Sequence, residues 1–360
     1  MRGAVAVHVC RGREWRGGER QVRLLVQTLA WRSGFLQHVV TRKGSALATA
    51  LDPAGPRVHP ASWELAIDPR ALHTLLQLLR ELRRRHGRDI LLHAHDSHAL
   101  AIALLAGRLL RLPVVATRRS ASPPGRLWRL PRRVIAISSA VQQALGTSGV
   151  AASRVVQIPS AVSLADLSHT PEAPLPPAPG VDGPVVLAVG AQTAEKGHTS
   201  LITALRVLQT SVPDAHVVLV GDGPERPRLE RRARELRLQD RVHFLGERPS
   251  AAYLIRSAQV LAQPSIREGL GTTVLEAMAL GTPVVATATG GLVELLQGGA
   301  GCLVPPGNPD ALAEALARVL TDALFRAAMV HEARARVAQY DAPTVADQVA
   351  EVYRSALRTT

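Results

Sequence analysis

Short apolar runs, bounded by glycine or proline, alternate along the chain with segments of helical periodicity. Such alternation favours βα units and parallel sheets. In the first half we expect strands at residues 3–9, 36–41, 90–94, 114–117, 134–137 and 155–158, and helices at 19–31, 69–86, 99–110 and 139–146. In the second half we expect strands at 185–189, 215–220, 242–245, 260–263, 284–286 and 302–304, and helices at 200–210, 225–236, 250–257, 272–280, 291–296, 309–321, 322–339 and 342–357.

The pattern stops between residues 166 and 184, a stretch that is rich in proline and typical of a linker. We therefore predict an α/β protein with two Rossmann-like, doubly wound domains, which suits a chain of 360 residues. The expected parts are a basic N-terminal domain at 1–165, the linker at 166–184, a second domain at 185–340 and a C-terminal helix at 341–360. Ligands bind at the carboxyl ends of strands in such folds, so we expect the site in a cleft between the domains.

Composition excludes several classes of protein. The mean hydropathy of +0.08 is too high for a disordered chain and too low for a membrane-spanning one. The longest apolar stretch, 99–116, is interrupted by Arg108 and Arg111, and the apolar run at 5–10 is too short for a signal peptide. Cys10 and Cys302 lie far apart and predict neither a disulfide framework nor a metal cluster, which suits a reducing cytoplasm.

The net charge of +14 belongs entirely to the first half. Residues 1–180 hold 25 basic and 10 acidic side chains, whereas residues 181–360 hold 18 and 19. This asymmetry predicts that the first half faces an anionic partner: nucleic acid, an anionic membrane or a phosphorylated acceptor. Leu127, Trp128 and Leu130 stand among arginines and would suit a membrane interface, although a solvated loop with a core tryptophan fits as well.

Lys196 is the first candidate for chemistry. It lies between the strand that ends at Gly190 and the start of a helix, where free N–H groups and the helix dipole favour an anion. Lys43 and Lys196 are the only lysines among 43 basic residues, so a lysine here departs from the chain's preference for arginine. We interpret it as a compact charge for phosphate oxygens.

The second candidate is the loop and helix start from Ser265 to Glu276. Glu268 follows a strand, and a carboxylate accepts hydrogen bonds from sugar or ribose hydroxyls. The amides of residues 269–273, at a helix N-terminus, suit a diphosphate. Glu276 could equally complement the helix dipole. The glycine turns at 221–224 and 290–291 are more typical of structural turns than of binding elements.

These motifs occur in a specific order along residues 185–320. They read Val-Gly…Glu-Lys196-Gly197-His, Val-Leu-Val-Gly221-Asp-Gly-Pro-Glu, Arg241-Val-His-Phe-Leu-Gly246, Gln263-Pro-Ser…Glu268-Gly…Leu-Glu276-Ala-Met-Ala-Leu-Gly-Thr-Pro and Gly301-Cys-Leu-Val-Pro-Pro-Gly-Asn-Pro-Asp. Taken together they resemble the retaining glycosyltransferases of family 4, which have the GT-B fold. The first half resembles that family more loosely, through residues 15–20, 90–95 and 134–138.

The resemblance implies a role for each matching residue, with Lys196, Glu268 and His95 as the catalytic set. Lys196 would bind the donor diphosphate, Glu268 would hold donor-sugar hydroxyls, and Glu276 would hold the ribose. His95 would face the transferred sugar from the first half. The remaining donor-binding positions are Gly17, Gly190, Gly269, Leu270, Gly271 and Thr272.

Two positions depart from the family pattern. Ala191 stands where the family usually has an arginine on the diphosphate, and Ser160-Ala161 replaces the usual Asn-Gly. A nearby residue such as Arg267 would be a substitute for the lost cation. No Asp-x-Asp motif occurs in the sequence, so we expect a metal-independent site without a cofactor.

The resemblance implies transfer from a nucleotide-diphosphate sugar, with UDP as the expected nucleotide, to an acceptor hydroxyl with retention of configuration. We expect a bacterial enzyme of lipopolysaccharide or other cell-surface glycan assembly, cytoplasmic or peripheral on the inner face of the cytoplasmic membrane, with a glycan or lipid-linked acceptor and no nucleic acid. Three alternatives remain: a non-catalytic homologue that only binds nucleotide sugar, a transferase for a soluble sugar acceptor, and a sugar-nucleotide epimerase.

Overall fold

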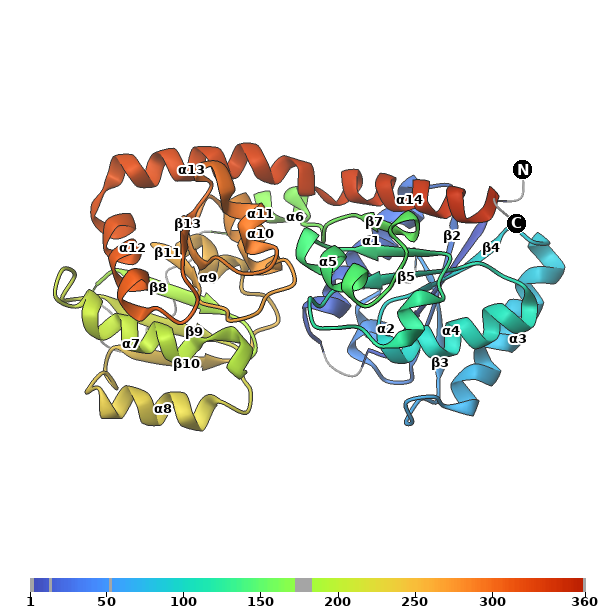
Figure 1. Ribbon diagram of the computed structural model, residues 1–360, viewed down its shortest axis with the longest axis horizontal. Coiled ribbons are helices and arrows are strands. Elements are labelled where there is room, and N and C mark those ends of the chain that lie inside the picture. The colour runs from blue at the N-terminus through green and yellow to red at the C-terminus, as the bar shows by residue number, and fades with distance from the viewer. Residues whose placement is uncertain (1–2, 13–14, 52–53, 172–182, 359–360) are drawn as a thin grey trace. The chain divides into compact units, whose positions relative to one another are not determined.

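The computed structural model describes residues 3–12, 15–51, 54–171 and 183–358. The chain divides into two compact units, here called unit 1 (residues 1–161 and 340–360) and unit 2 (residues 162–339). Each unit has one parallel sheet with helices packed against it (Figure 1). The predicted fold class, two Rossmann-like domains, is therefore confirmed.

Unit 1 is built on seven strands in the order β3-β2-β1-β4-β5-β6-β7. The strands are β1 (Val5–Cys10), β2 (Leu36–Arg42), β3 (Arg57–Ala61), β4 (Ile90–Ala94), β5 (Val114–Arg118), β6 (Arg133–Ala136) and β7 (Val155–Gln157). The helices are α1 (Gly17–Arg32), α2 (Ala46–Ala50), α3 (Pro69–His86), α4 (Ser97–Leu110), α5 (Ser139–Thr147) and α14 (Ala342–Arg358), with short 3-10 helices η1 (Arg126–Arg129) and η2 (Ala152–Arg154).

Unit 2 is built on six strands in the order β10-β9-β8-β11-β12-β13. The strands are β8 (Val185–Val189), β9 (His216–Val220), β10 (Val242–Gly246), β11 (Val260–Gln263), β12 (Val284–Thr287) and β13 (Cys302–Val304). The helices are α6 (Leu164–Ser168), α7 (His198–Leu208), α8 (Arg226–Glu235), α9 (Ala252–Ser257), α10 (Thr272–Leu280), α11 (Leu292–Leu296), α12 (Pro309–Thr321) and α13 (Ala323–Val337), with 3-10 helices η3 (Ala194–Lys196), η4 (Gln297–Gly299) and η5 (Ala338–Tyr340), the last of which ends in unit 1.

The strands form because their side chains are buried on both faces of each sheet. The strands Val185–Val189 and Val260–Gln263 match their predicted bounds. Their apolar side chains, together with those of the other strands of the sheet, form one apolar core in unit 2. Helix starts follow from capping side chains: Asp96 caps α4, and Asn308, the chain's one asparagine, caps α12 through an Oδ1 that accepts from the amide of Ala311.

The strand β3 and the short helix α2 were not predicted. β3 lies at the edge of its sheet and contains Pro60. Proline is tolerated at an edge because its missing N–H breaks no internal ladder. The sequence Arg57–Ala61 is not a continuous apolar run, which is the signal on which the strand predictions were based, and β3 was missed for this reason.

The last helix packs into unit 1. Tyr353 and Ala356 of α14 are fully buried in a core that also contains Leu91 of β4 and Leu29 of α1. Of the predicted linker at 166–184, residues 172–182 lie outside the described part of the chain. Residues 164–168 form the helix α6, which belongs to unit 2 and contacts α10.

Candidate active site

Lys196 and Glu268 form an ion pair in unit 2. The Lys196 Nζ donates to Glu268 Oε2 at 2.7 Å, and the two side chains are 26% and 12% exposed. They lie 72 residues apart in sequence, one after β8 and the other after β11. Because these strands are neighbours in a parallel sheet, both residues follow carboxyl ends at the same edge.

Other side chains hold the Glu268 carboxylate in place. Gln263 Nε2 and Ser265 Oγ also donate to Oε2, at 3.2 Å and 3.1 Å. The second oxygen, Oε1, accepts the amide of Gly269 at 3.2 Å. Oε2 thus accepts three hydrogen bonds and Oε1 only one from these residues, so Oε1 can still accept one from a ligand hydroxyl.

The turn that carries Lys196 is pressed against the loop that carries Glu268. Gly197 has φ 65°, and a Cβ there would lie 2.1 Å from the carbonyl oxygen of Pro264. Ile266 donates its amide to the carbonyl of Glu195 at 2.8 Å, which ties the two loops together. Only glycine fits at 197, and this close approach brings the lysine to the glutamate.

The helix α10 begins directly beyond Glu268. Its N-cap is Gly271, whose side chain cannot accept from the first-turn amides, so those N–H groups are free of side-chain capping. Glu276 lies one turn into α10 and is half-buried. Gly190 ends β8 with φ 156°, and the Cβ position of Gly190 lies 3.7 Å from Lys196 Cε, so the lysine stem crosses over this glycine.

Two glycine turns brace these loops, as their structural interpretation predicts. A Cβ on Gly290 would lie 1.8 Å from the Glu268 carbonyl oxygen, and one on Gly291 would lie 2.7 Å from Leu270 Cα. A Cβ on Gly221 would lie 2.1 Å from the carbonyl oxygen of Gly190. These turns therefore pack closely against the backbone at Glu268, Leu270 and Gly190 and fix its position.

We expect Gly290→Ala to destabilise unit 2 by about 2–4 kcal/mol, because the new methyl collides with backbone and the residue has φ 53°. Gly307→Ala is the matched control: Gly307 has φ 72°, but its Cβ would meet nothing within 4 Å. Thermal unfolding followed by circular dichroism measures both. Equal losses of stability in the two variants would contradict the packing argument.

The sequence interpretation missed several polar groups near the pair. Gln263 and Ser265 are buried and act on Glu268, although their position after a strand would have been a usable signal. Within the described residues, His198 Nδ1 and Gln192 Oε1 are buried without a hydrogen-bond partner. Burial lowers the pKa of His198 to about 4, so this ring is neutral at physiological pH.

Arg267, the suggested substitute for the cation lost at Ala191, points to another partner. Its guanidinium binds the carboxylate of Glu195, and both side chains are more than half exposed. Lys196 is therefore the cation that the structure places on Glu268.

In unit 1, His95 follows β4 and joins a buried histidine network. His8 Nδ1 lies 2.8 Å from His95 Nε2, and His93, on the same face as predicted, has its ring centroid 4.1 Å from that of His95. The ligand atoms of these three histidines lie within 4.8 Å of one another. Both nitrogens of His8 and of His93 are hydrogen-bonded, those of His93 to Tyr353 and Thr117, whereas His95 Nδ1 has only a 3.5 Å contact with the Arg119 guanidinium.

Burial makes this network sensitive to acid. Burial lowers the pKa of His8 to about 4 from 6.5 and those of His93 and His95 well below 6.5; it also lowers to about 4 the pKa of His38, which lies outside this network and pairs with His59 at 2.9 Å. Between about pH 6.5 and pH 4, the unfolded chain therefore binds protons on these histidines that the folded chain does not bind. Stability conferred by these neutral rings is fully present above pH 6.5 and is lost as the pH falls toward 4.

We expect the free energy of unfolding of unit 1 to fall by more than about 2 kcal/mol between about pH 7 and about pH 5. All four tryptophans, at positions 15, 31, 63 and 128, belong to unit 1. Urea unfolding followed by tryptophan fluorescence therefore reports on this unit. A stability that is constant over this range would contradict the prediction.

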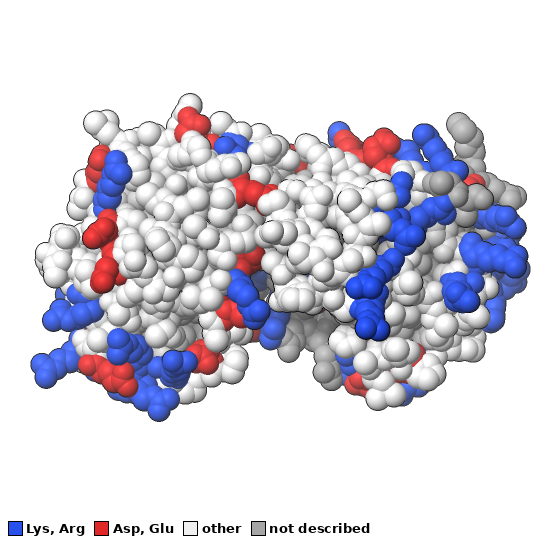
Figure 2. Space-filling model, in the orientation of Figure 1, with Lys and Arg blue, Asp and Glu red and all other residues white. Residues whose placement is uncertain are grey.

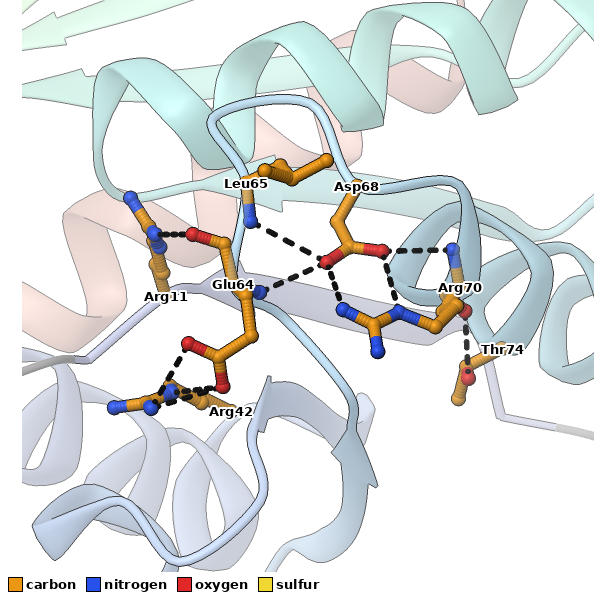
Figure 3. A network of polar contacts seen from close by, with 7 residues as sticks. All are labelled: Arg11, Arg42, Glu64, Leu65, Asp68, Arg70 and Thr74. Atoms are coloured by element: carbon orange, nitrogen blue, oxygen red, sulfur yellow. Dashed lines mark hydrogen bonds and ion pairs between the residues drawn. The ribbon is translucent and has the colours of Figure 1, made fainter.

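The carboxyl edge of the unit 1 sheet is held by a second polar network (Figure 3). The Arg11 guanidinium donates to the carbonyl of Glu64, whose carboxylate pairs with Arg42 at 2.9 Å. Asp68 accepts from the amides of Glu64 and Leu65 and from Arg70, and these bonds hold the pKa of Asp68 well below its usual range. The loop between β3 and α3 is thus fixed at the strand ends, as a binding edge requires.

Gly17, predicted in the loop after the first strand, is the first residue of α1 and is exposed. At the first position of the helix its amide has no intrahelical partner, and its contact with the donor phosphate stays a prediction.

Comparison with known proteins places the chain. A model of glycosyltransferase family 4 matches residues 15–166, and a model of glycosyl transferases group 1 matches residues 176–336. A phosphatidyl-myo-inositol mannosyltransferase of Mycolicibacterium smegmatis is 32% identical over 284 residues, which cover 73% of this chain and 70% of that protein. The chain therefore belongs to the glycosyltransferases that these two models describe, with family 4 matching its first half and group 1 its second.

A second relative and a solved structure are similar to the chain over different lengths. A D-inositol 3-phosphate glycosyltransferase of Corynebacterium urealyticum is 39% identical over 181 residues, or 48% of this chain and 43% of that protein. The chain thus matches less than half the length of this relative. Among solved structures, that of Anabaena HepE in complex with UDP-glucose is 25% identical, with a TM-score of 0.83 over 98% of this chain and 100% of that one.

Proposed function

We propose that this glycosyltransferase moves a sugar from a nucleotide-diphosphate sugar, UDP-linked, to an acceptor hydroxyl with retention of configuration. The observation that carries the proposal is the Lys196–Glu268 pair at 2.7 Å beside the uncapped start of α10. A cation and free amides suit the diphosphate, and the open Oε1 of Glu268 suits a sugar hydroxyl. The UDP-glucose complex of HepE supports the choice of donor.

The negative charge that develops on the leaving diphosphate would be met by Lys196 and by the amides of residues 270–272 rather than by a metal ion. The lysine uses one of its three N–H groups on Glu268, which leaves donors for phosphate oxygens. Such preorganised donors act strongest on charge that appears in the transition state. Glu276, on the same helix, would bind the ribose hydroxyls of the nucleotide.

Retention would follow from attack on the same face that the diphosphate leaves. The bond between the acceptor oxygen and the anomeric carbon forms, the bond to the phosphate oxygen breaks, and that phosphate oxygen takes the acceptor's proton. We assign no protein nucleophile. Glu268 would orient the sugar through its hydroxyls, and His95 of unit 1 would contact the transferred sugar.

A donor screen tests the proposal. Purified protein is incubated with UDP-, GDP- and ADP-linked sugars together with total bacterial lipid extract, and release of the nucleoside diphosphate is measured. Glycosylated lipid supports the proposal, whereas free disaccharide points to a soluble acceptor and an epimerised donor to an epimerase. Binding of a nucleotide sugar without turnover would identify a non-catalytic homologue, for which the loss of arginine at Ala191 is the structural reason.

The acceptor would be a lipid-linked glycan of the cell envelope, reached from the inner face of the cytoplasmic membrane. Basic side chains gather on unit 1, around the end of α3 in Figure 2, whereas both signs are mixed on unit 2. The exposed arginines of unit 1 include Arg84, Arg85, Arg88, Arg108, Arg111, Arg126 and Arg129. None of the helices in the described ranges is both long and apolar enough to cross a bilayer.

Exposed leucines accompany these arginines. Leu105 and Leu109 of α4 are 41% and 60% exposed, and Leu127 and Leu130, in and after η1, are 43% and 60% exposed. The two elements are in contact, so we call these four residues the leucine patch. Trp128 does not belong to it: the ring is buried under the Arg118 guanidinium, so it is the core tryptophan of the alternative that the sequence left open.

Flotation with liposomes tests the leucine patch. We expect the double variant Leu109→Glu/Leu130→Glu to bind anionic vesicles at least about tenfold less than the unaltered protein, because two apolar contacts are lost and two charges are repelled. Leu324→Glu is the matched control, since Leu324 is 85% exposed on unit 2. Equal flotation with neutral and anionic vesicles at low salt would contradict the electrostatic part of the proposal.

A further inference from the structure

The histidine network of unit 1 begins at a buried glutamine whose orientation is fixed. Gln37 of β2 is 5% exposed, and its Nε2 donates to the carbonyl of Phe35 at 2.8 Å. A carbonyl oxygen can only accept, so the amide nitrogen must be on that side. The Gln37 Oε1 therefore faces the His8 ring, at 2.8 Å from Nε2.

This orientation determines which nitrogen of each ring carries the proton. Because Gln37 Oε1 accepts, His8 Nε2 must be the protonated nitrogen, and His8 Nδ1 is then a bare acceptor in a neutral ring. His95 Nε2 lies 2.8 Å from that acceptor and must donate to it. His95 is consequently protonated at Nε2 and bare at Nδ1.

The bare nitrogen of His95 faces a cation. Arg119, at the end of β5, donates from NH1 to the carbonyl of His95 at 3.3 Å, while its NH2 lies 3.5 Å from His95 Nδ1. That second contact is at the limit of a hydrogen bond, so Nδ1 remains open to a better donor. Burial, the neighbouring histidines and Arg119 together keep His95 uncharged, with a pKa well below its ordinary value.

We propose that Gln37 and His8 are positioning residues that hold His95 as a neutral hydrogen-bond acceptor at Nδ1, so that it receives a hydrogen bond from a sugar hydroxyl and gives none. The proposal rests on the proposed contact between His95 and the transferred sugar. A hydroxyl is the complementary ligand, since its O–H can donate to Nδ1 while its oxygen accepts from Arg119. Gln37 and His8 themselves touch no substrate; they act through the tautomer of His95.

The tautomer is measured without any substrate. The full chain is labelled with ¹⁵N-histidine, and long-range ¹H–¹⁵N correlation spectra report which ring nitrogen carries the proton; the His95 signals are assigned by their absence in His95→Gln. We expect His8 and His95 both protonated at Nε2. Protonation of His95 at Nδ1, or a charged ring, at about pH 7 would overturn the proposal.

Variants at Gln37 then link the tautomer to the reaction. Gln37→Met keeps the length of the side chain but removes its acceptor, so the Nε2-protonated form of His95 should no longer dominate, and kcat should fall about tenfold with KM for the donor little changed. Gln37→Glu retains an acceptor for His8 and should restore much of the lost kcat. Thr117→Val is the control, because it removes a partner of His93 in the same buried layer and leaves the chain from Gln37 to His95 intact.

The outcomes separate this proposal from the proposed function. A shifted tautomer in Gln37→Met with unchanged kcat would overturn the positioning role while leaving the glycosyltransferase assignment in place. An unaltered protein that shows the expected tautomers but turns over no nucleotide sugar would contradict the proposed function instead. A loss of kcat in Thr117→Val equal to that in Gln37→Met would show a general packing effect and overturn the proposal.

Discussion

Lys196→Ala is expected to lower kcat/KM for the nucleotide sugar by roughly 10³-fold. The ammonium is the cation that the structure places on Glu268, and position 191, where the family resemblance implies an arginine, holds alanine. Donors that meet developing charge contribute about 3–4 kcal/mol each in a preorganised site. The chain should remain folded, because Gln263 and Ser265 still donate to Glu268 after the lysine is removed, so the carboxylate keeps hydrogen-bond partners.

Steady-state kinetics with varied donor, together with a thermal unfolding curve, check this prediction. The sequence supplies its own control in Lys43, the other lysine, which is exposed in unit 1. Lys43→Ala should leave kcat/KM within about twofold. Near-normal turnover by purified, folded Lys196→Ala would remove the lysine from the mechanism.

A double-mutant cycle separates two possible roles of the lysine. If Lys196 only orients the Glu268 carboxylate, the double variant Lys196→Ala/Glu268→Ala should be no worse than Glu268→Ala alone. If Lys196 binds phosphate directly, as proposed, adding its loss to Glu268→Ala should weaken binding of the nucleoside diphosphate by about a further tenfold. Isothermal titration with UDP measures that second effect without any turnover.

The sequence predicted the sheet cores well because their signal is local. Val185–Val189 and Pro309–Thr321 match their expected bounds, since a fully buried parallel strand is a continuous apolar run and a helix starts at a capping residue followed by proline. The edge strand β3 was missed because Arg57–Ala61 is not a continuous apolar run, whereas the edge strands β7, β10 and β13 were predicted. The packing of the last helix could not be predicted either, because the hydrogen bond between Tyr353 and His93 joins residues 260 positions apart.

The candidate site was likewise predictable from the sequence only in part. The position of Lys196 after one strand and Glu268 after another could be read from the sequence, but their contact at 2.7 Å depends on a backbone approach at Gly197 that periodicity does not encode. The partners of His95 were also hidden, because Gln37 and His8 come from two other strands of the sheet. A lone buried glutamine or histidine in a strand has no sequence signature that distinguishes it from ordinary core.

Glu268→Gln is expected to lower kcat by roughly 10³-fold while the protein binds UDP about as well as before. The amide has the size of the carboxylate, but its nitrogen has no lone pair for a hydroxyl, and the oxygen that remains must serve Lys196, Gln263 and Ser265. A neutral group also accepts hydrogen bonds more weakly than a carboxylate, so the sugar loses orientation chiefly in the transition state.

The control for this variant is Glu314→Gln, an exposed glutamate on α12, which should keep full activity. Glu268→Asp provides a graded test: it keeps the charge but withdraws the carboxylate by one methylene, so it should lose activity but retain more than Glu268→Gln. If Glu268→Gln instead lost UDP binding and retained kcat at saturating donor, the carboxylate would serve the nucleotide and not the sugar. The assignment of donor-sugar hydroxyls to Glu268 would then be wrong, because only a group that acts on the sugar changes turnover without changing affinity for the sugar-free nucleotide.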